Sequence, residues 1–574
     1  MTTVILRRQI EKLPDLPTLP LLRRIYAARD ITTAQQLEKR LNALCPPTAL
    51  KGMTAALDVL TTALREQQRI VIVADYDADG ATSCALAVRA LRALGAENTS
   101  YVVPDRFKYG YGLTPEIVAL AQEQQPQLLI TVDNGISSID GVEAARDLGI
   151  RVLITDHHLP GNQLPAADAI VNPNQPDDRF PSKHLAGVGV IFYVMAALRS
   201  HLREQGWFAE RPPNMGQFLD LVAFGTVADV VILDHTNRIL VEQGLQRIRA
   251  RQCVPGITAL IEVAGRNHQR LSASDIGYFL GPRLNAAGRL ENMAHGIECL
   301  LCDDLDQARS MARELDRMNQ ERRFIEADMH SQAMGALEHL NLDGADLPYG
   351  LCLFDDSWHQ GVIGILASRI KERTHRPVVA FAPGSVQPQQ TPQLKGSARS
   401  VKGVHIRDVL DAVASQNPGL ISKFGGHAMA AGLSLPTPHL ELFSTAFDRE
   451  VRRYLGPEDL RGMLLSDGEL TPEELTLSMA ETLRDAGPWG QGFPEPLFDG
   501  VFELVSHRVL QEKHLKLILR PLAGGPTLDA IAFGKAKEFG TPKSTKVHIA
   551  YRLDVNEYRG QQSVQLRIEH IEEA

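Results

Sequence analysis

The stretch IVIVADYDADGATS occupies residues 70–83 and joins a run of β-branched residues to three closely spaced acids. Val and Ile in unbroken succession predict a short strand that is buried on both faces. The carboxylates of Asp75, Asp77 and Asp79 repel one another unless a positive charge lies among them. The stretch therefore indicates a buried parallel sheet, with a cation site where its first strand ends.

The residues that follow repeat this strand–helix pattern. Short strands rich in Val, Ile and Leu alternate with segments of helical composition, and helices of this length between such strands indicate βαβ units. The predicted strands are TSYVVPD (99–105), LLITVDNG (128–135) and RVLITDHH (151–158), and the predicted helices are 80–95, 114–124 and 139–149.

Acidic or imidazole side chains follow three of these strands. Besides the first cluster, Asp133 lies in TVDNG, and Asp156, His157 and His158 are adjacent in ITDHH. The carboxyl ends of parallel strands line one edge of a sheet, so we expect these side chains to converge although they are distant in sequence. Asp229, at the end of the apolar run FLDLVAFGTVA, is a fourth candidate.

The DYDADG cluster also matches the opening of an EF-hand calcium loop. The twelfth position of such a loop would be Leu86, where the loop requires a Glu, and a strand precedes the cluster instead of a helix. Capping of the next helix explains one Asp but not three. Mixed carboxylate and imidazole ligands favour a metal such as Mn²⁺, and two ions about 3.5–4 Å apart suit a phosphoryl displacement. The residue chemistry predicts a two-metal phosphoesterase.

The composition is that of a multidomain globular protein: 574 residues, of which 44% are hydrophobic and 22% charged. No apolar run reaches bilayer-spanning length, and no signal peptide is recognisable at the N-terminus. The six cysteines are scattered without framework spacing, which is typical of reduced thiols, so we expect a cytoplasmic protein. The net charge of −9 argues against a basic coat but leaves a local nucleic-acid groove open.

The pattern predicts an α/β multidomain protein. Residues 304–341 contain no Pro, and no Gly before Gly335, which favours a long connecting helix, although two shorter helices fit the periodicity equally well. Residues 501–574 form short strands and carry eleven Lys and Arg against nine Asp and Glu, which suits an oligonucleotide-binding (OB-like) barrel. The predicted segments are an N-terminal helical segment (1–55), a parallel-sheet domain (56–303), the connecting helix (304–341), a mixed α/β domain (342–460) and the barrel (461–574).

The motifs DYDADG, VDNG, TDHH and VADVV, in this order, resemble the metal-binding motifs of the DHH phosphoesterase superfamily, and Asp156, His157 and His158 match the run that names it. KFGGHAMAAG (423–432) resembles the glycine-rich signature of the associated DHHA1 domain. GPRLNAAGRL (281–290), GSARS (396–400) and GPWGQGFPEP (487–496) complete the set. Over residues 50–574 the ensemble is similar to the single-strand-specific 5′→3′ DNA exonucleases of this superfamily.

The resemblance implies an enzyme that hydrolyses single-stranded DNA to 5′-mononucleotides in DNA repair and recombination, with two Mn²⁺ or Mg²⁺ ions as cofactors. It places the metals, with Asp133 bridging them, on Asp75, Asp77, Asp79, Asp133, His157 and Asp229. The implied catalytic residues are Asp79, Asp133, His158, Arg283, Asn285 and Arg289, with His158 on the scissile phosphate. The implied substrate contacts are Arg106, Ser397 and Arg399 for the terminal 5′-phosphate, and Gly425, Gly426 and His427.

One position departs from the pattern. Val73 stands where smaller members of the superfamily have a His, so the ligand set of one ion stays open, with Asp75 or water as the substitute. The role of Asp75, direct or through another ligand, is open for the same reason.

Other functions are also considered. A phosphodiesterase for dinucleotides or short oligonucleotides needs only the two core domains, whereas the β-rich tail favours the exonuclease. A non-catalytic single-strand-binding scaffold would lack metal ligands that this chain retains. GVGVIF (187–192) lacks the third glycine of a dinucleotide-binding fingerprint. The partners that the resemblance implies are single-stranded DNA with a 5′ end, a single-stranded-DNA-binding protein and a helicase. We expect a monomer and no membrane association.

Overall fold

The computed structural model describes residues 3–105, 108–109, 112–339, 347–384, 392–540, 544–558 and 560–574. These residues divide into two compact units. The larger unit is Arg7–Asn319 with Ser466–Ala574, and the smaller is Gln320–Leu465 with the N-terminal residues up to Leu6. Among the described residues no helix is both long and apolar enough to cross a membrane.

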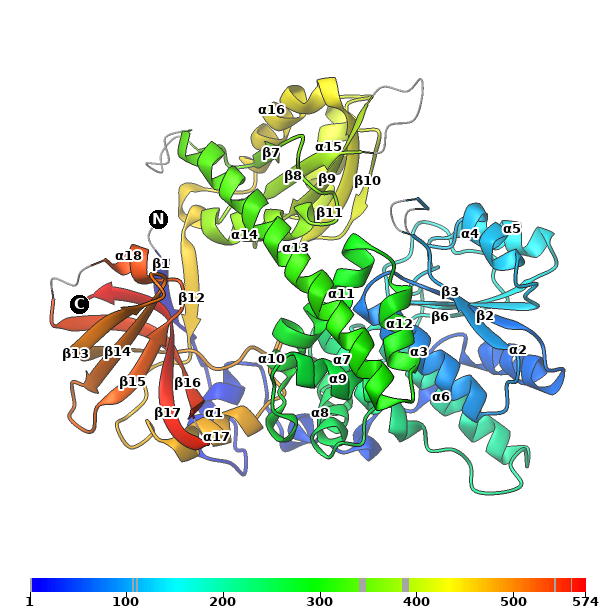
Figure 1. Cartoon of the computed structure of the whole chain (residues 1–574), viewed down its shortest axis with the longest axis horizontal. Helices are drawn as coiled ribbons and strands as arrows, with labels where there is room; N and C mark the ends of the chain where they lie inside the picture. The colour runs from blue at the N-terminus through cyan, green and yellow to red at the C-terminus, as the bar shows by residue number, and fades with distance from the viewer. Residues whose placement is uncertain are drawn as a thin grey trace. The chain divides into compact units, whose positions relative to one another are not determined.

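The predicted parallel sheet lies in the larger unit and has five strands, one more than the four expected above (Figure 1). Its order is β3-β2-β4-β5-β6. β3 pairs with one edge of β2, and β4, followed by β5 and β6, lies on the other side of β2. The strand order therefore reverses between β2 and β4. The strands are β2 (Ile70–Ala74), β3 (Thr99–Val102), β4 (Leu128–Val132), β5 (Arg151–Thr155) and β6 (Ala169–Val171).

Helices cover both faces of this sheet because alternate strand residues are apolar on both sides. Ile70 and Ile72 belong to the cluster that contains α2, α3 and α6, whereas Val71 and Val73 pack with α4 and α5. These helices are α2 (Met53–Arg65), α3 (Ala78–Ala93), α4 (Pro115–Gln122), α5 (Ile139–Asp147) and α6 (Gly187–Glu204).

A helical layer completes this part of the larger unit. α7 is mostly buried and apolar apart from Asp220 and Thr226, and it packs among α3, α6 and α8. A π-helical turn, Ile276–Leu280, leads into α11. The helices are α7 (Leu219–Ala228), α8 (His235–Arg249), α9 (Pro255–Val263), α10 (Ala273–Asp275), α11 (Gly281–Leu290), α12 (Ala294–Leu301) and α13 (Leu305–His339). α13 is one continuous helix that passes from the larger unit into the smaller.

The C-terminal residues form a closed five-stranded barrel of order β13-β14-β15-β17-β16, which confirms the predicted OB-like fold. One apolar cluster extends from the barrel to the parallel-sheet part, so the two share a continuous core. The elements are α17 (Leu477–Asp485), β13 (Phe498–Leu510), β14 (His514–Pro521), β15 (Leu528–Ala532), α18 (Ala536–Phe539), β16 (Lys546–Tyr558) and β17 (Gln561–Glu573).

The smaller unit is a mixed sheet of order β10-β11-β9-β8-β7. α14 packs on β8 and β9, and α15 and α16 belong to a separate apolar cluster with the sheet. The elements are β7 (Leu351–Phe354), α14 (Ile363–Thr374), β8 (Val378–Pro383), β9 (Gln393–Arg399), α15 (Ile406–Gln416), β10 (Lys423–Gly426), β11 (Ala430–Pro436) and α16 (Leu440–Val451).

The N-terminal segment differs from the helix that we expected over residues 1–55. Residues 3–55 contain β1 (Thr3–Arg7), α1 (Pro20–Ala27), three short 3₁₀ turns and the start of α2. Prolines at 14, 17, 46 and 47 restrict the helix to one short stretch, because proline within a helix removes a backbone hydrogen bond. β1 pairs with β12 (Gly462–Ser466) in a two-stranded sheet.

Candidate metal centre

The carboxyl ends of β2, β4 and β5 bring acids to one edge of the parallel sheet. The last residues of these strands pair in parallel register. Asp75, Asp133 and Asp156 therefore each follow directly after one of three adjacent strands. The edge includes the reversal in strand order, where open parallel sheets bind their ligands.

Three overlapping groups of side chains at this edge could each hold a metal ion, since the ligand atoms within a group lie within 4.8 Å of one another. His157 connects two of the groups: its Nε2 lies 3.1 Å from Asp133 Oδ1 and 3.5 Å from Asp229 Oδ2. The groups are Asp75, Asp77 and Asp133; Asp79, His157 and Asp229; and Asp133, His157 and His158. They contain all six residues that we predicted as metal ligands.

Asp79 is held at the N-terminus of α6. Gly187 N donates to Asp79 Oδ2 at 2.6 Å, and Val188 N donates to Asp79 Oδ1 at 2.9 Å. A helix N-terminus favours a carboxylate at this place. Burial and the nearby Asp229 carboxylate raise the pKa of Asp79. The side chain is thus fixed by α6, but the two N–H donors do not offset the effects of burial and of the neighbouring acids on its pKa.

Asp133 is the most constrained of the acids. Its backbone is left-handed, with φ +62°, and its side chain is only 2% exposed. Burial, followed by the charges of Asp79 and Asp77, raises its pKa well above the ordinary value. A Cβ on Gly187 would lie 2.6 Å from Asp133 Cβ, so the absence of a side chain at residue 187 leaves room for this carboxylate.

Asp156 orients the two histidines. Its Oδ1 accepts from His157 N at 2.7 Å and from His158 N at 3.1 Å, and it lies 2.7 Å from His158 Nδ1. Burial alone would lower the pKa of His158, but the hydrogen bond and charge of Asp156 raise it to about 9. Burial lowers the pKa of His157. The two imidazoles are therefore suited to different tasks, His157 to metal binding and His158 to contact with an anion.

Asp75 and Asp77 are engaged with the backbone of their own loop. Asp77 Oδ1 accepts from Asp79 N at 2.9 Å and from Gly80 N at 3.0 Å, which caps α3. Asp75 Oδ1 accepts from Tyr76 N at 2.8 Å. The capping interpretation of DYDADG thus holds for Asp77, in addition to its place in a metal-ligand group.

Asp229 follows a helix, unlike the other acids, which follow strands or lie at the start of α3. It is the C-cap residue of α7, and burial, followed by the charge of Asp77, raises its pKa. Gly225, one turn earlier, allows α7 to approach the site: a Cβ there would lie 2.8 Å from Asp79 Oδ1. The close packing of α7 on α3 therefore brings Asp229 to the centre.

The residues present fit divalent cations. The buried acids of the centre raise the pKa values of one another, and a cation among them would remove that repulsion. Within the described part of the chain, His157 Nε2 is buried and makes no hydrogen bond, as expected of a metal-binding nitrogen. Val73 lies in the apolar cluster beneath α4 and α5 and offers no ligand.

α11 packs against the DYDADG loop. A Cβ on Gly288 would lie 1.9 Å from Tyr76 O, so the helix approaches this backbone closely. Asn285 Oδ1 accepts from Ala78 N at 2.8 Å, which gives it a contact that positions α3. Arg283 donates through Nε to Asp316 Oδ1 at 2.8 Å and through Nη1 to Phe279 O. Arg289 follows Gly288 and is half-buried.

The predicted substrate contacts of the smaller unit lie on and beside three paired strands. Ser397 pairs with Gly432, and Gly432 pairs with Gly425, so these residues form one row across β9, β11 and β10. A Cβ on Gly425 or Gly432 would meet nothing within 4 Å, which leaves open backbone.

Other residues of this group lie next to the row. Arg399 Nη1 donates to Ser397 Oγ at 3.0 Å, and burial lowers the pKa of Arg399. Gly426, the last residue of β10, has φ +146°, a conformation that favours glycine. The exposed His427 follows it. Arg106 lies outside the described residues.

Comparison with known proteins agrees with this architecture. Residues 69–226 match the DHH family, N-terminal domain, residues 347–453 match the DHHA1 domain, and residues 466–570 match the RecJ OB domain. The chain is 54% identical over 571 residues to the single-stranded-DNA-specific exonuclease RecJ of Escherichia coli (strain K12), covering 98% of each chain. The chain belongs to the RecJ family. The Haemophilus influenzae member is 50% identical, over 100% of this chain and 99% of the relative.

Solved RecJ structures share the fold. The crystal structure of RecJ in complex with Mn²⁺ from Thermus thermophilus has a TM-score of 0.79 at 30% identity, covering 97% of this chain and 76% of that one. The crystal structure of exonuclease RecJ bound to manganese has a TM-score of 0.58 at 34% identity, covering 71% and 96%. In both matches the sequence identity and the TM-score are high enough to indicate more than a shared general fold.

Two functional features of this RecJ family member are not evident from the motifs alone. Gly187 and Val188, which hold Asp79, belong to GVGVIF, where the sequence suggests no more than an incomplete dinucleotide fingerprint. Asp156 orients both histidines without belonging to a metal-ligand group. The signal that could have identified Gly187 is a glycine at the start of a buried helix, where a helix N-terminus approaches an anion.

Proposed function

We propose that this chain is a metal-dependent exonuclease that hydrolyses single-stranded DNA from its 5′ end to 5′-mononucleotides, in DNA repair and recombination. The observation that carries the proposal is the set of three overlapping carboxylate and imidazole groups at the ends of β2, β4 and β5. The names of the relatives support single-stranded DNA as the substrate. Mn²⁺ or Mg²⁺ are the proposed ions, since the T. thermophilus relative was crystallised with each.

Six side chains would hold the ions: Asp75, Asp77, Asp79, Asp133, His157 and Asp229. Two divalent cations, when bound there, supply an activated water and neutralise charge on the leaving 3′-oxygen. Asp133, which belongs to two of the ligand groups, is the proposed bridging residue.

His158 is the proposed contact to the scissile phosphate. Asp156 lies at its Nδ1, so Nε2 is the nitrogen that would donate to a phosphate oxygen. The Asp156 carboxylate also keeps the imidazole cationic, which strengthens a hydrogen bond to an anion. Arg283 and Arg289, from α11, would add positive charge near the same phosphate, and Asn285 would hold α3 in place.

The open face of the smaller unit is the proposed site for the DNA backbone and its 5′-phosphate. Strand residues without side chains let a backbone approach, and Ser397 and Arg399 supply donors beside them. Lys395 and Lys423 flank the glycine row on the same strands and are exposed. We assign Gly425, Gly426 and His427 to the same surface, and Arg106 to the 5′-phosphate.

The barrel is the proposed grip on the single strand downstream of the reaction. Closed five-stranded barrels of this type bind single strands through their surface strands and loops. The presence of this barrel favours the exonuclease over a phosphodiesterase of dinucleotides. The retained ligand groups argue against a non-catalytic scaffold.

The further partners are inferred from the family. We infer that a single-stranded-DNA-binding protein and a helicase supply the substrate, and that the enzyme acts in the bacterial cytoplasm as a monomer. All six cysteines are free thiols, which supports a reducing compartment.

The test is digestion of a long 5′-phosphorylated single strand, labelled at one end or the other, with Mn²⁺ or Mg²⁺. We expect a 5′ label to be released as mononucleotide at once and a 3′ label to be released last. A reaction with EDTA is the control and should show no release. Early release of the 3′ label, or equal attack on blunt duplex, would refute the proposal.

A further inference from the structure

Residues 490–493, within the motif GPWGQGFPEP, form a tight turn that we call the glycine turn. Phe493 N donates to Gly490 O at 3.1 Å, and Gly490 N donates to Phe493 O at 2.9 Å. Gly492 has φ +70°, the conformation that the third position of a type II turn requires and that glycine adopts without strain. The motif has no part in the metal centre or the open sheet face described above.

The glycine turn packs against the residues that follow Asp229. Leu233 N donates to Gln491 O at 2.8 Å. A Cβ on Gly490 would lie 2.7 Å from Leu233 Cδ1, and a Cβ on Gly492 would lie 2.6 Å from Ile232 Cγ2. An alanine at either position therefore requires the side chain of Leu233 or Ile232 to move, and these residues are only three or four positions after Asp229.

α8 holds the same segment through other backbone atoms. Asn237 Nδ2 donates to Ile232 O at 2.8 Å, and Arg238 Nη1 donates to Leu233 O at 2.9 Å. The Arg238 guanidinium also lies 4.3 Å over the ring of Phe493. Arg238 therefore contacts both the segment after Asp229 and the glycine turn.

The segment stores backbone strain next to the metal centre. Val230, directly after Asp229, has φ +62°, a left-handed conformation that is an outlier for a β-branched residue. Its side chain is exposed, so burial of that side chain does not hold it there. Such strain persists only where the surrounding structure enforces it. α7 holds the chain before Val230, since Val230 N donates to Val227 O at 3.3 Å, and the contacts to residues 232–233 restrict the chain after it.

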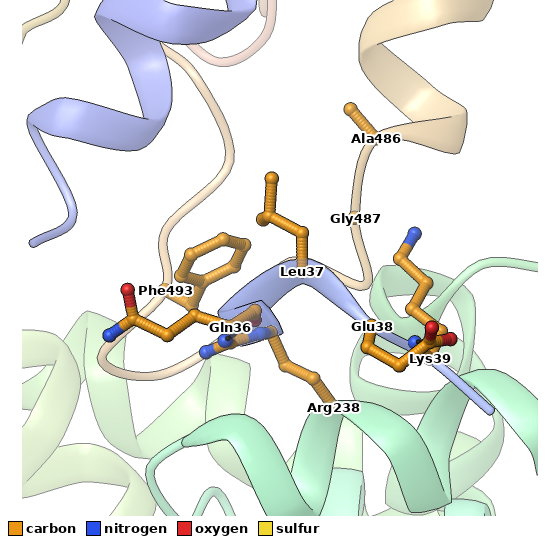
Figure 2. Close-up of a pocket in the computed structure, with 8 residues that line it drawn as sticks. All are labelled: Gln36, Leu37, Glu38, Lys39, Arg238, Ala486, Gly487 and Phe493. Atoms are coloured by element: carbon orange, nitrogen blue, oxygen red, sulfur yellow. Dashed lines mark hydrogen bonds between the residues drawn. The ribbon is translucent and has the colours of Figure 1, made fainter. Parts of the chain in front are cut away.

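Little empty space remains beside the glycine turn. Figure 2 shows the cavity next to Phe493, which has a volume of about 10 Å³ and room for about one water molecule. Its lining residues are Gln36, Leu37, Glu38, Lys39, Arg238, Ala486, Gly487 and Phe493. The motif is therefore a packed support and not a ligand pocket.

We propose that the glycine turn is a positioning element for Asp229. By fixing residues 232–233 it keeps the Val230 backbone strained, and the Asp229 carboxylate thereby stays 3.5 Å from His157 Nε2. The inference rests on the proposed metal function, and it extends the positioning of that centre to a loop that leads into the barrel at β13. Gly490, Gln491 and Gly492 act through Asp229 and do not themselves belong to a metal-ligand group.

The experiment measures Mn²⁺ binding to the full-length, metal-stripped protein from the electron paramagnetic resonance signal of free Mn²⁺. Gly492→Ala is the test variant, and Gly534→Ala is the matched control, since Gly534 has φ +72° but a Cβ there would meet nothing within 4 Å. We expect Gly492→Ala to weaken binding of one ion about tenfold, a typical effect of losing an outer support of a metal ligand. The control should bind Mn²⁺ like the unaltered protein.

A second substitution tests whether the effect passes through residue 232. Ile232→Ala removes the Cγ2 atom that the new methyl group meets, so the double variant should recover most of the lost affinity. Binding of single-stranded DNA without metal should be unchanged in both. If Gly492→Ala unfolds, Gly490→Ala, which needs no left-handed backbone, takes its place. Leu233→Ala is then the second substitution, because a Cβ on Gly490 would meet Leu233 Cδ1.

Three results would overturn the proposal: normal Mn²⁺ binding by Gly492→Ala, an equal loss in Gly534→Ala, or no recovery in the double variant. Failure of the proposed metal function would look different, because the unaltered protein itself would then bind no Mn²⁺.

Discussion

Substitution of Gly187 by alanine should disable the metal centre while leaving the fold intact. Gly187 is the first residue of α6, and its N–H donates to Asp79 Oδ2 at 2.6 Å. A Cβ built on it would lie 2.6 Å from Asp133 Cβ and 2.7 Å from Asp133 Oδ1. One methyl group thus affects two of the proposed ligands. It contacts Asp133 directly, and any shift of the residue 187 backbone disturbs the hydrogen bond to Asp79.

The size of the effect follows from these distances. Carbon atoms in contact prefer about 3.5–4.0 Å, so about 1 Å must be gained by moving Asp133 or by moving α6. In the first case a ligand is displaced, and in the second the hydrogen bonds to Asp79 are lengthened beyond the usual range of about 2.7–3.2 Å. A misplacement of about 1 Å can cost about 100-fold in rate. The overpacking itself should cost about 1–3 kcal/mol of stability.

The assay is the initial rate of mononucleotide release from a 5′-phosphorylated single strand, with thermal unfolding followed in parallel. We expect the rate to fall about 100-fold and the protein to remain folded. Gly189→Ala is the matched control on the same helix, because the tightest contact of a Cβ there would be with Leu185 Cδ2, the movable end of that side chain, at 3.2 Å. A Gly187→Ala variant with more than half the normal rate would refute the reasoning.

Three further predictions concern single side chains. Asp133→Asn should remove Mn²⁺ binding and lower turnover by more than the roughly 10–100-fold expected for loss of an outer support, and a variant with normal Mn²⁺ stoichiometry would contradict the bridging role. Arg399→Ala should reduce the preference for a 5′-phosphorylated over a 5′-hydroxyl strand about tenfold in a competition assay. Arg407→Ala, at an exposed position, is the control and should leave this preference unchanged. Equal effects of the two substitutions would exclude a specific phosphate contact. Burial raises the pKa of Asp220 to about 6, so its ionisation opposes folding and stability falls as the pH rises from about 4 through 6. Asp220→Asn keeps an acceptor for Val254 N. In urea titrations it should raise the free energy of unfolding by up to about 3 kcal/mol at pH 7.5 and by little at pH 4. An equal gain at both pH values would show another cause.

The parallel sheet and its acidic edge could be predicted because both depend on local patterns. Four Val- and Ile-rich strands alternate with helices, and βαβ topology then places the residues after the strands at one edge. Asp75, Asp133 and His157 could be predicted as site residues for this reason alone. Their mutual distances follow from adjacency of the strands, which the chain order of such a sheet permits but does not fix.

The remainder of the site depends on tertiary packing that leaves little local signal. Asp229 follows a helix, and only the approach of that helix to α3 at Gly225 brings it to the centre. The contact of Asn285 with the backbone at Ala78 is a further example, because no local pattern in the sequence indicates it. A similar limit applies to residues 3–55, where prolines replace most of the expected helix and the remaining apolar residues find partners near the other end of the chain.

That last contact affects how the protein is made. Tyr26 donates to Ala486 O, and Arg29 forms a buried ion pair with Asp467, so the N-terminal core is completed by residues more than 400 positions later. At about 5–20 residues per second, a ribosome needs roughly 20–90 seconds to cover that distance. During this time the apolar side chains of residues 16–31 have no permanent partner from the barrel side. Slower translation would therefore lengthen the time for which these side chains lack their late partners.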